Sequence, residues 1–378
     1  MAEWWHPDRL AARRERLAAR GRILDAARVF FAGEGLVEVD TPALQVSPGM
    51  EPHLKPFGTL LNDPRDNSLK PRYLHTSPEF AMKKLLAGGM TQIWQLAHAF
   101  RDGERGATHH PEFSMLEWYR AGADYTALMA DCEALLRQAQ RAATFLPRHS
   151  REGGNPGRAT ERLPLDPRLR GGDEQGNGGA MTWRGRTADA NQPFERLSVA
   201  EAFTRHTGID ILATAPDPDR PSFALLADAA AKAAIEPHPG DDWETLYFRI
   251  FLDRIEPHLG IGAPTILYDY PVSMAALSRE KPGDPRLCER FELYVCGLEL
   301  ANAFSELTDP AEQRGRFIAE QASKQRLYGH TTPIDDDFLA ALEHGLPDCA
   351  GIALGFDRLV MLCTDAETIE DVLWAPVD

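Results

Sequence analysis

Residues 292–306 have the composition and alternation of side chains typical of buried strands, but they include glutamates among their apolar residues. Glu292 and Glu299 stand seven positions apart, and Glu306 shares a strand face with Asn302 and Phe304. A carboxylate in so apolar a setting needs a cation, a metal ion or the proton of another carboxylate. Carboxylate oxygens suit Mg²⁺ beside a nucleotide phosphate. The alternative is a salt bridge to a nearby arginine.

A second polar pattern lies in residues 91–120, which predict two strands joined by a polar loop over 101–110. Side chains alternate along a strand, so Phe113, Glu117 and Tyr119 share one face of the second strand. An aromatic ring, a carboxylate and a phenol on one face suit a flat base and an ammonium group. The alternative is an amphipathic strand whose Glu117 faces water.

Two predicted helix starts also carry charged side chains. The chain closes with a strand, a glycine turn and a helix over 350–363, with Asp357 as a cap and Arg358 in the first turn. The helix dipole disfavours a cation there, so an anionic ligand would account for Arg358. The other start lies at Ser77, a predicted cap, and is followed by Glu79.

Helices and strands are predicted on both sides of a break in composition. Apolar residues at helical spacing predict helices over 10–31 and 124–143, and a strand-rich block runs over 265–307. Residues 147–190 are rich in glycine, proline and charge, which predicts a disordered insertion. We therefore expect one domain, residues 1–378, interrupted by that insertion.

The composition disfavours several classes of protein. The 378 residues include 41 Lys+Arg against 57 Asp+Glu, a net charge of −16, which argues against non-specific nucleic-acid binding. No run approaches the ~20 apolar residues of a membrane-spanning helix, and the N-terminus does not read as a signal peptide. The five cysteines form no Cys-x-x-Cys pair, so neither a zinc ribbon nor a disulfide framework is expected. We expect a cytoplasmic, globular protein.

Other catalytic patterns are missing from the sequence. It holds no Gly-x-Ser-x-Gly nucleophile and no His-Glu-x-x-His metal motif. His109 and His110 are a poor metal pair, because adjacent side chains on an extended chain point in opposite directions.

Three segments, in order, resemble the signature motifs of class II aminoacyl-tRNA synthetases. Residues 35–42 resemble motif 1, which lies at the dimer interface in that family, residues 100–113 resemble motif 2, and residues 353–358 resemble motif 3. The resemblance is strongest to lysyl-tRNA synthetase, through Ser-Pro-Glu-Phe, Phe-Ser-Met-Leu-Glu-Trp-Tyr and Asn-Ala-Phe-Ser-Glu. It implies a homodimer and an α+β catalytic domain, an antiparallel sheet flanked by helices, without an anticodon-binding domain.

Within that family the chain resembles short paralogs that attach (R)-β-lysine to a lysine of elongation factor P. Too few residues precede the first motif for an anticodon-binding barrel, so productive tRNA charging is not expected. Ser77 stands where the synthetase usually has alanine, and Ala353 where it usually has glycine. Both residues are expected to reshape the pocket around the backbone end of the substrate.

The resemblance assigns a role to each matching residue. Arg101 and Arg358 are expected to be catalytic, Glu292 and Glu299 to hold Mg²⁺, and Phe113 to stack on adenine. The residues expected to bind ATP are Arg101, Glu104, His109, Phe113, Glu292, Glu299 and Arg358. The residues expected to bind the amino acid are Ser77, Glu79, Glu117, Tyr119, Asn302, Phe304, Glu306 and Ala353.

The two ends of the amino acid are assigned to different groups. Glu79 is expected to meet the amino group near the carboxylate, and Glu117, Tyr119 and Glu306 the distal ammonium. One departure from the synthetase pattern is Gly103, which stands where a glutamate usually contacts adenine, with Glu104 one residue later.

The implied reaction is that of an ATP-dependent ligase. The carboxylate of (R)-β-lysine, or of lysine, attacks the α-phosphate of ATP, and a lysine of elongation factor P then displaces AMP. One alternative is a truncated lysyl-tRNA synthetase or a free-standing amino-acid adenylating ligase. Another is a non-enzymatic paralog that binds an amino acid. An acidic acceptor would need a local basic surface, expected from Lys83, Lys84, Arg101 and Arg105.

Overall fold

The computed structural model describes residues 4–144, 179–275 and 277–377. Most of the predicted insertion, residues 147–178, lies outside the described residues. Its end is ordered: β7 (Met181–Trp183) pairs with β8 (Arg186–Ala188), and Met181 is fully buried. The prediction of disorder over 147–190 is therefore wrong at its C-terminal end, because apolar side chains there pack into the main core.

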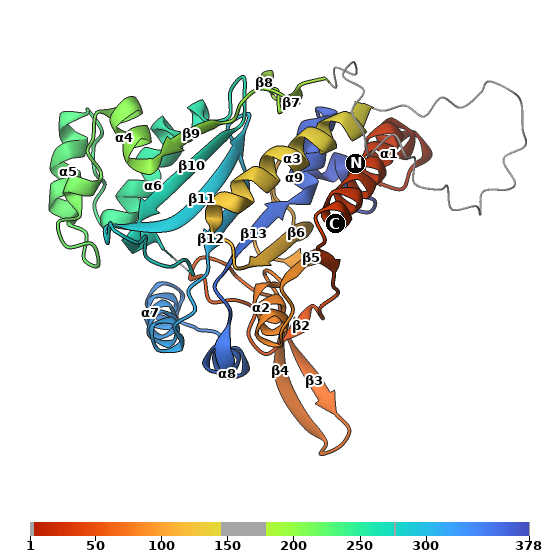
Figure 1. The fold of residues 1–378 in the computed structure, drawn as a ribbon, viewed down its shortest axis with the longest axis horizontal. Coiled ribbons are helices and arrows are strands. Elements are labelled where there is room, and N and C mark those ends of the chain that lie inside the picture. The colour runs from red at the N-terminus through yellow and green to blue at the C-terminus, as the bar shows by residue number, and fades with distance from the viewer. Residues whose placement is uncertain (1–3, 145–178, 276, 378) are drawn as a thin grey trace, which may run out of the picture.

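An eight-stranded sheet forms the centre of the molecule, in the order β1-β5-β6-β13-β12-β11-β10-β9 (Figure 1). Its strands are β1 (Val37–Glu38), β5 (Gln92–Phe100), β6 (Glu112–Ala121), β9 (Glu195–Ser198), β10 (Thr265–Pro271), β11 (Leu287–Val295), β12 (Leu298–Ser305) and β13 (Cys349–Gly355). All neighbours are antiparallel except β1 with β5 and β9 with β10. The expected antiparallel sheet is confirmed in its middle, and parallel pairs close both ends. Strands from both sides of the insertion, β6 and β13, are neighbours.

One face of this sheet is covered by α1 (Pro7–Gly33), α3 (Tyr125–Thr144) and α9 (Phe356–Thr364). The first two confirm the helices predicted over 10–31 and 124–143. Leu116 and Trp118 of β6 point into this core, and Phe31 of α1 stacks on Trp94 with ring centroids 4.7 Å apart. Because side chains alternate, the intervening residues of β6 point to the opposite face.

Two further helix groups extend the fold, one at the β9–β10 end of the sheet and one below its middle in the view of Figure 1. A cluster on β10 contains α4 (Val199–Thr207), α5 (Phe223–Lys232) and α6 (Trp243–Arg254). Another contains α2 (Glu79–Ala87), α7 (Pro310–Tyr328) and α8 (Asp336–Gly345). Short 3₁₀ helices lie at Leu212–Thr214, Glu256–His258, Val272–Met274 and Ile369–Val372. Within the described residues, no helix is long and apolar enough to cross a membrane.

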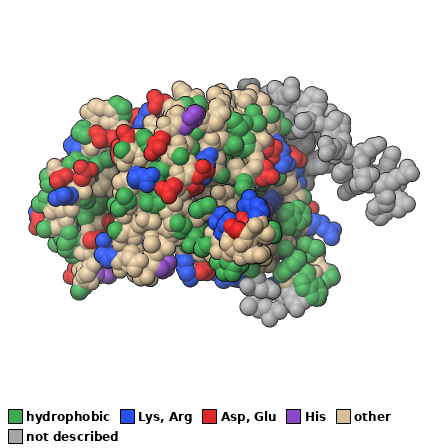
Figure 2. Space-filling view, turned by 90° about the horizontal axis from the view of Figure 1, so that it is seen from below, with side chains coloured by type: hydrophobic (Ala, Val, Ile, Leu, Met, Phe, Trp, Pro, Cys, Tyr) green, Lys and Arg blue, Asp and Glu red, His purple; other side chains and the backbone are tan. Residues whose placement is uncertain are grey.

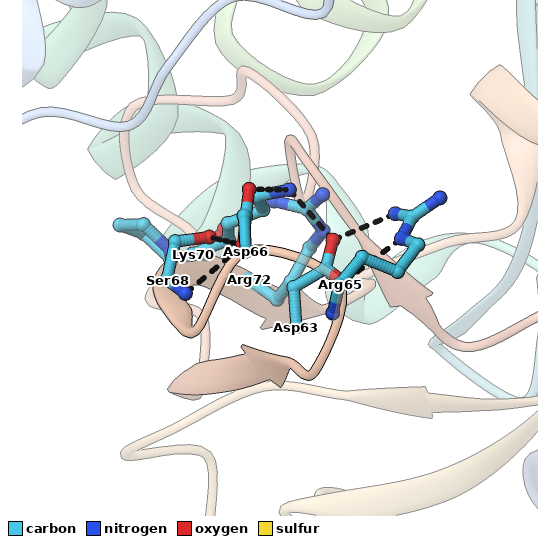
Figure 3. Close-up of polar contacts among 7 residues, drawn as sticks. Asp63, Arg65, Asp66, Ser68, Lys70 and Arg72 are labelled. Carbon is cyan, nitrogen blue, oxygen red and sulfur yellow. Dashed lines mark hydrogen bonds and ion pairs between the residues drawn. The ribbon is translucent and has the colours of Figure 1, made fainter.

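A hairpin projects from the body below α2 (Figure 1). Its strands, β3 (Gly58–Asp63) and β4 (Ser68–Leu74), form a small sheet with β2 (Leu44–Gln45). Near its tip Asp63 accepts hydrogen bonds from Arg65 (2.6 Å) and Lys70 (2.7 Å), and these cations hold the pKa of Asp63 below its usual range (Figure 3). The side chains of Leu60 and Leu69 are mostly exposed.

Candidate active site

A cavity of about 350 Å³ opens on the face of the sheet opposite α1, α3 and α9. It lies where β6, β13 and β12 are neighbours, between the loop that follows β5 and the start of α2. The predicted site residues that line it are Ser77, Glu79, Arg101, Glu104, His109, Phe113, Glu117, Tyr119, Glu299, Asn302, Phe304, Glu306, Ala353 and Arg358. Glu292 does not line the cavity.

Glu117 lies at one end of this cavity and does not face water, because its side chain is only 1% exposed. Its carboxylate accepts a hydrogen bond from Ser77 Oγ at 2.5 Å and from Tyr119 OH at 3.1 Å. Burial, and then the negative charge of Glu79, raise the pKa of Glu117 to about 8. The alternative of a solvent-exposed strand face is therefore wrong.

Ser77 and Ala353 both lie beside Glu117. Ser77 Oγ accepts a hydrogen bond from the backbone N–H of Glu79 (3.1 Å) and donates to Glu117. The N-cap of α2 is Pro78, so the predicted cap at Ser77 is wrong by one residue. Ala353 is the partner of Glu117 in the pairing of β13 with β6. The resemblance assigned Ser77 and Ala353 to one end of the substrate and Glu117 to the other. In the structure, strand register places Ala353 beside Glu117, and a hydrogen bond joins Ser77 to Glu117.

Lys83 is a site residue that the sequence analysis missed. It was expected on a basic surface, but it is 1% exposed and its ammonium lies between two carboxylates. Its Nζ is 2.5 Å from Glu79 Oε1 and forms a second ion pair with Glu306 Oε2. The spacing of Glu79 and Lys83, four residues apart on α2, was the available signal.

Gly351 makes the close approach of β13 to this end of the cavity possible. A Cβ at this position would lie 2.2 Å from Tyr119 Cε1 and 2.3 Å from Glu306 Oε1. Both distances are far below van der Waals contact, so a side chain here would displace the phenol and the carboxylate.

Arg101 and Phe113 lie toward the other end of the cavity. The Arg101 guanidinium stands 5.1 Å from the centre of the Phe113 ring, and Glu104 is 3.7 Å from Arg101 Nη1. Arg101 Nε is buried and has no hydrogen-bond partner among the described residues. A buried guanidinium nitrogen without a partner is suited to an anionic ligand.

Arg358 and His109 form a second cationic group. Arg358 donates to the backbone oxygens of Thr108 (3.2 Å) and Glu299 (2.8 Å), and its Nη2 lies 2.9 Å from His109 Nε2. Burial, and then the charge of Arg358, lower the pKa of His109. The imidazole is therefore neutral near pH 7 and accepts from the guanidinium.

Asp357 does not cap α9, contrary to the sequence prediction. The N-cap is Gly355, and Asp357 lies inside the first turn, buried. Its carboxylate accepts from the backbone N–H of Ser114 (2.7 Å) and pairs with Arg20 of α1. Because Ser114 follows Phe113 and Asp357 precedes Arg358, this contact fixes two cavity residues relative to each other.

The two proposed magnesium ligands, Glu292 and Glu299, differ in their contacts. Glu292 pairs with Arg290 (2.7 Å) and accepts from Tyr294 OH (2.5 Å), as the salt-bridge alternative expects. Glu299 has no ion pair within 4.0 Å in the described part of the chain, and burial, then the charge of Glu292, raise its pKa to about 7. A divalent cation beside Glu299 would reduce the electrostatic repulsion between the carboxylates of Glu292 and Glu299. The described residues contain no group of three or more metal-ligating side chains, so such an ion would also need phosphate oxygens.

Sequence comparison agrees with the fold. Residues 6–378 match the family model for class II tRNA synthetases (D, K and N), so the chain belongs to this family. The chain is 37% identical over 375 residues to the elongation factor P--(R)-beta-lysine ligase of Sodalis glossinidius, covering 98% of this chain and 96% of that protein. It is also 37% identical over 375 residues to the ligase of the same name from Yersinia enterocolitica, covering 99% and 97%.

Proposed function

We propose that this protein is an ATP-dependent ligase that activates (R)-β-lysine, or lysine, and transfers it to a lysine of elongation factor P. The main support for this proposal is that one cavity has buried carboxylates at one end and Arg101, Arg358 and His109 at the other. The first end suits an amino acid with two ammonium groups, and the second suits a triphosphate. The full-length relatives named as (R)-beta-lysine ligases support the choice of substrate and acceptor.

The reaction has two steps. A substrate carboxylate oxygen attacks the α-phosphorus of ATP, a new oxygen–phosphorus bond forms, and pyrophosphate leaves. The neutral amine of the acceptor lysine then attacks the carbonyl carbon of the adenylate, AMP leaves with the electron pair, and the new amide nitrogen loses a proton. Catalysis rests on positioning and charge neutralisation rather than on a covalent enzyme intermediate.

Each group of cavity residues serves one part of this reaction. Arg101 neutralises the α-phosphate and the substrate carboxylate, Phe113 and Glu104 hold adenine, and Arg358 with His109 holds the outer phosphates. The residues that hold the amino acid are Ser77, Glu79, Glu117, Tyr119, Asn302, Phe304, Glu306 and Ala353. Mg²⁺ held by Glu299 and by phosphate oxygens would supply further neutralisation of phosphate charge, and Glu292 would join it only by giving up its contacts with Arg290 and Tyr294.

We infer that the protein acts as a cytoplasmic homodimer. Support for the dimer comes from apolar side chains left exposed around the segment that resembles motif 1, with Val37 52%, Leu44 38% and Val46 44% exposed. An apolar cluster of this kind is suited to a second copy of the chain.

One labelling experiment tests the function. The protein is incubated with ATP and labelled (R)-β-lysine in the presence of both elongation factor P and lysine tRNA, and the two macromolecules are then separated. We expect label in elongation factor P, and none with an Arg358→Ala variant, because a charge-assisted contact to the phosphates is lost. Label in tRNA, or in neither macromolecule, would overturn the proposal.

A further inference from the structure

We propose that Lys83 is a positioning residue, which holds the two carboxylates of Glu79 and Glu306 and sets the charge of the pocket so that it selects an amino acid with two ammonium groups. This inference rests on the proposed function. Lys83 does not line the cavity and is buried behind it. It therefore acts on the substrate through the two glutamates.

The contacts of Lys83 leave one oxygen of each glutamate available. Lys83 Nζ binds Oε1 of Glu79 and Oε2 of Glu306, and it stands 5.5 Å from the centre of the Phe304 ring. Glu306 Oε1 is buried and has no hydrogen-bond partner among the described residues. Because Glu306 lines the cavity, this oxygen is the free acceptor for a substrate ammonium.

The charge count explains why a buried lysine stands here. When ionised, the glutamates Glu79, Glu117 and Glu306 and the single ammonium of Lys83 leave two surplus negative charges. Glu51 also lines the cavity, but it is partly exposed, so water screens its charge and it is left out of this count. A substrate with two ammonium groups neutralises that surplus, whereas an amino acid with one ammonium leaves a buried charge unpaired, which is costly. The substrate's own carboxylate is assigned to Arg101 at the other end of the cavity.

Lys83 also acts against protonation of the glutamates. Burial lowers the pKa of Lys83, but the charges of Glu306 and Glu79 outweigh it, so its pKa is raised and it stays charged. Burial raises the pKa of Glu306 to about 8, and the charge of Lys83 opposes that shift. The titratable groups around Lys83 are Glu79 on α2, Glu117 and Tyr119 on β6, Glu306 after β12, Cys349 on β13, and Glu51, whose charge acts on Glu79. Without Lys83, the glutamates would bind protons at a higher pH than they do now.

The test is amino-acid-dependent exchange between pyrophosphate and ATP, measured from pH 6.5 to 9 for wild type and Lys83→Met. We expect the KM for (R)-β-lysine to rise ~100-fold or more while the KM for ATP stays within about 2-fold, because one partner of a buried ion pair is lost at the amino-acid end only. The pH at which kcat/KM reaches half its plateau should rise by about one unit or more.

Two variants control for structure. Lys83→Arg keeps the charge, so its pH profile should stay near that of wild type even if its KM rises. Lys84→Met removes the next lysine of α2, which pairs with Asp335 and Asp337 outside the cavity, and should leave both KM values unchanged. If Lys83→Met does not fold, Lys83→Gln carries the same prediction, and a shifted pH profile in Lys83→Arg contradicts the inference.

The outcomes separate this inference from the proposed function. If wild type shows no exchange with (R)-β-lysine or lysine, the proposed function fails. If wild type exchanges, but Lys83→Met keeps the wild-type KM for the amino acid and the wild-type pH profile, Lys83 has no positioning role and the inference alone fails.

Discussion

At the scale of single residues, the amino-acid end of the cavity is governed by buried carboxyl groups. Burial raises the pKa of Glu117 and of Glu306 to about 8, the charge of Glu79 adding to the shift in both. Below that pH each carboxyl group holds a proton and is neutral. A neutral carboxyl group gives up the charge-assisted hydrogen bond that a substrate ammonium requires.

The affinity for the amino acid should therefore depend on pH. Since the raised pKa values make the empty site bind protons below about pH 8, the KM for (R)-β-lysine should fall by about 10-fold between pH 7 and pH 8.5. The KM for ATP should change little over the same range. Steady-state kinetics at fixed ionic strength measure both, and an amino-acid KM that rises with pH would contradict the assignment.

The choice between (R)-β-lysine and α-lysine should depend on Ala353. Its methyl group lies on β13 opposite Glu117, where the synthetase usually has glycine. One methyl group in a tight pocket changes discrimination by about 10-fold or more. We expect wild type to adenylate (R)-β-lysine better than α-lysine, and Ala353→Gly to narrow the ratio of the two kcat/KM values by improving α-lysine. If Ala353→Gly leaves the ratio of the two kcat/KM values unchanged, Ala353 does not determine the choice between the two lysines.

At the scale of elements, the cavity depends on how α1, α9 and β6 are joined. Arg20 of α1 pairs with Asp357 of α9 and donates to Ser114 Oγ of β6 at 2.7 Å, all three buried. No single element supplies this contact. It aligns Phe113 and Arg358, which lie beside these residues in the sequence.

Arg20→Met should lower the free energy of unfolding by about 3–5 kcal/mol, because the buried carboxylate of Asp357 loses its cation. Denaturant titration measures this loss. The control is Arg28→Met on the same helix, whose exposed pair with Glu38 contributes little. Equal stabilities for the two variants would show that the Arg20 contact does not join the elements.

The insertion should be separable from the hairpin that follows it. Replacing residues 150–176 with a shorter Gly/Ser linker should leave the melting temperature within about 2 °C, since loop length affects stability only logarithmically. Extending the deletion through residue 190 removes the buried Met181, Ala188 and Ala190 and should lower it by more than about 5 °C. Thermal unfolding measures the melting temperature of both variants. A large drop in melting temperature with the shorter deletion would contradict the boundary between the insertion and the β7–β8 hairpin.

Sequence patterns predicted the elements that depend on local periodicity. The shared face of β6, from Phe113 to Tyr119, followed from strand alternation, and the helices α1 and α3 from apolar spacing. Lys83 and Asp357 were misplaced, because a lysine normally lies on the surface and the partner of Asp357, Arg20, is 337 positions away. The β7–β8 hairpin was missed because its burial depends on the main core rather than on its own composition.

At the scale of the whole molecule, the net charge of −16 does not gather into one acidic patch on the face that Figure 2 shows. Seen from the end where the β3–β4 hairpin projects, acidic and basic side chains are interspersed (Figure 2). Inside the cavity, the carboxylates of Glu79, Glu117 and Glu306 gather at one end, and the guanidinium groups of Arg101 and Arg358 lie at the other end beside Glu104 and Glu299. This internal separation is the feature that matches a di-ammonium amino acid joined to ATP.

The most direct test of that match is exchange of labelled pyrophosphate into ATP by the wild-type protein, with (R)-β-lysine, α-lysine or norleucine as the amino acid. Norleucine has the carbon chain of α-lysine without the side-chain ammonium. We expect exchange with both lysines, fastest with (R)-β-lysine, and at least ~100-fold less with norleucine, because an unpaired buried carboxylate remains. Exchange that proceeds equally with norleucine, or without any amino acid, would contradict it.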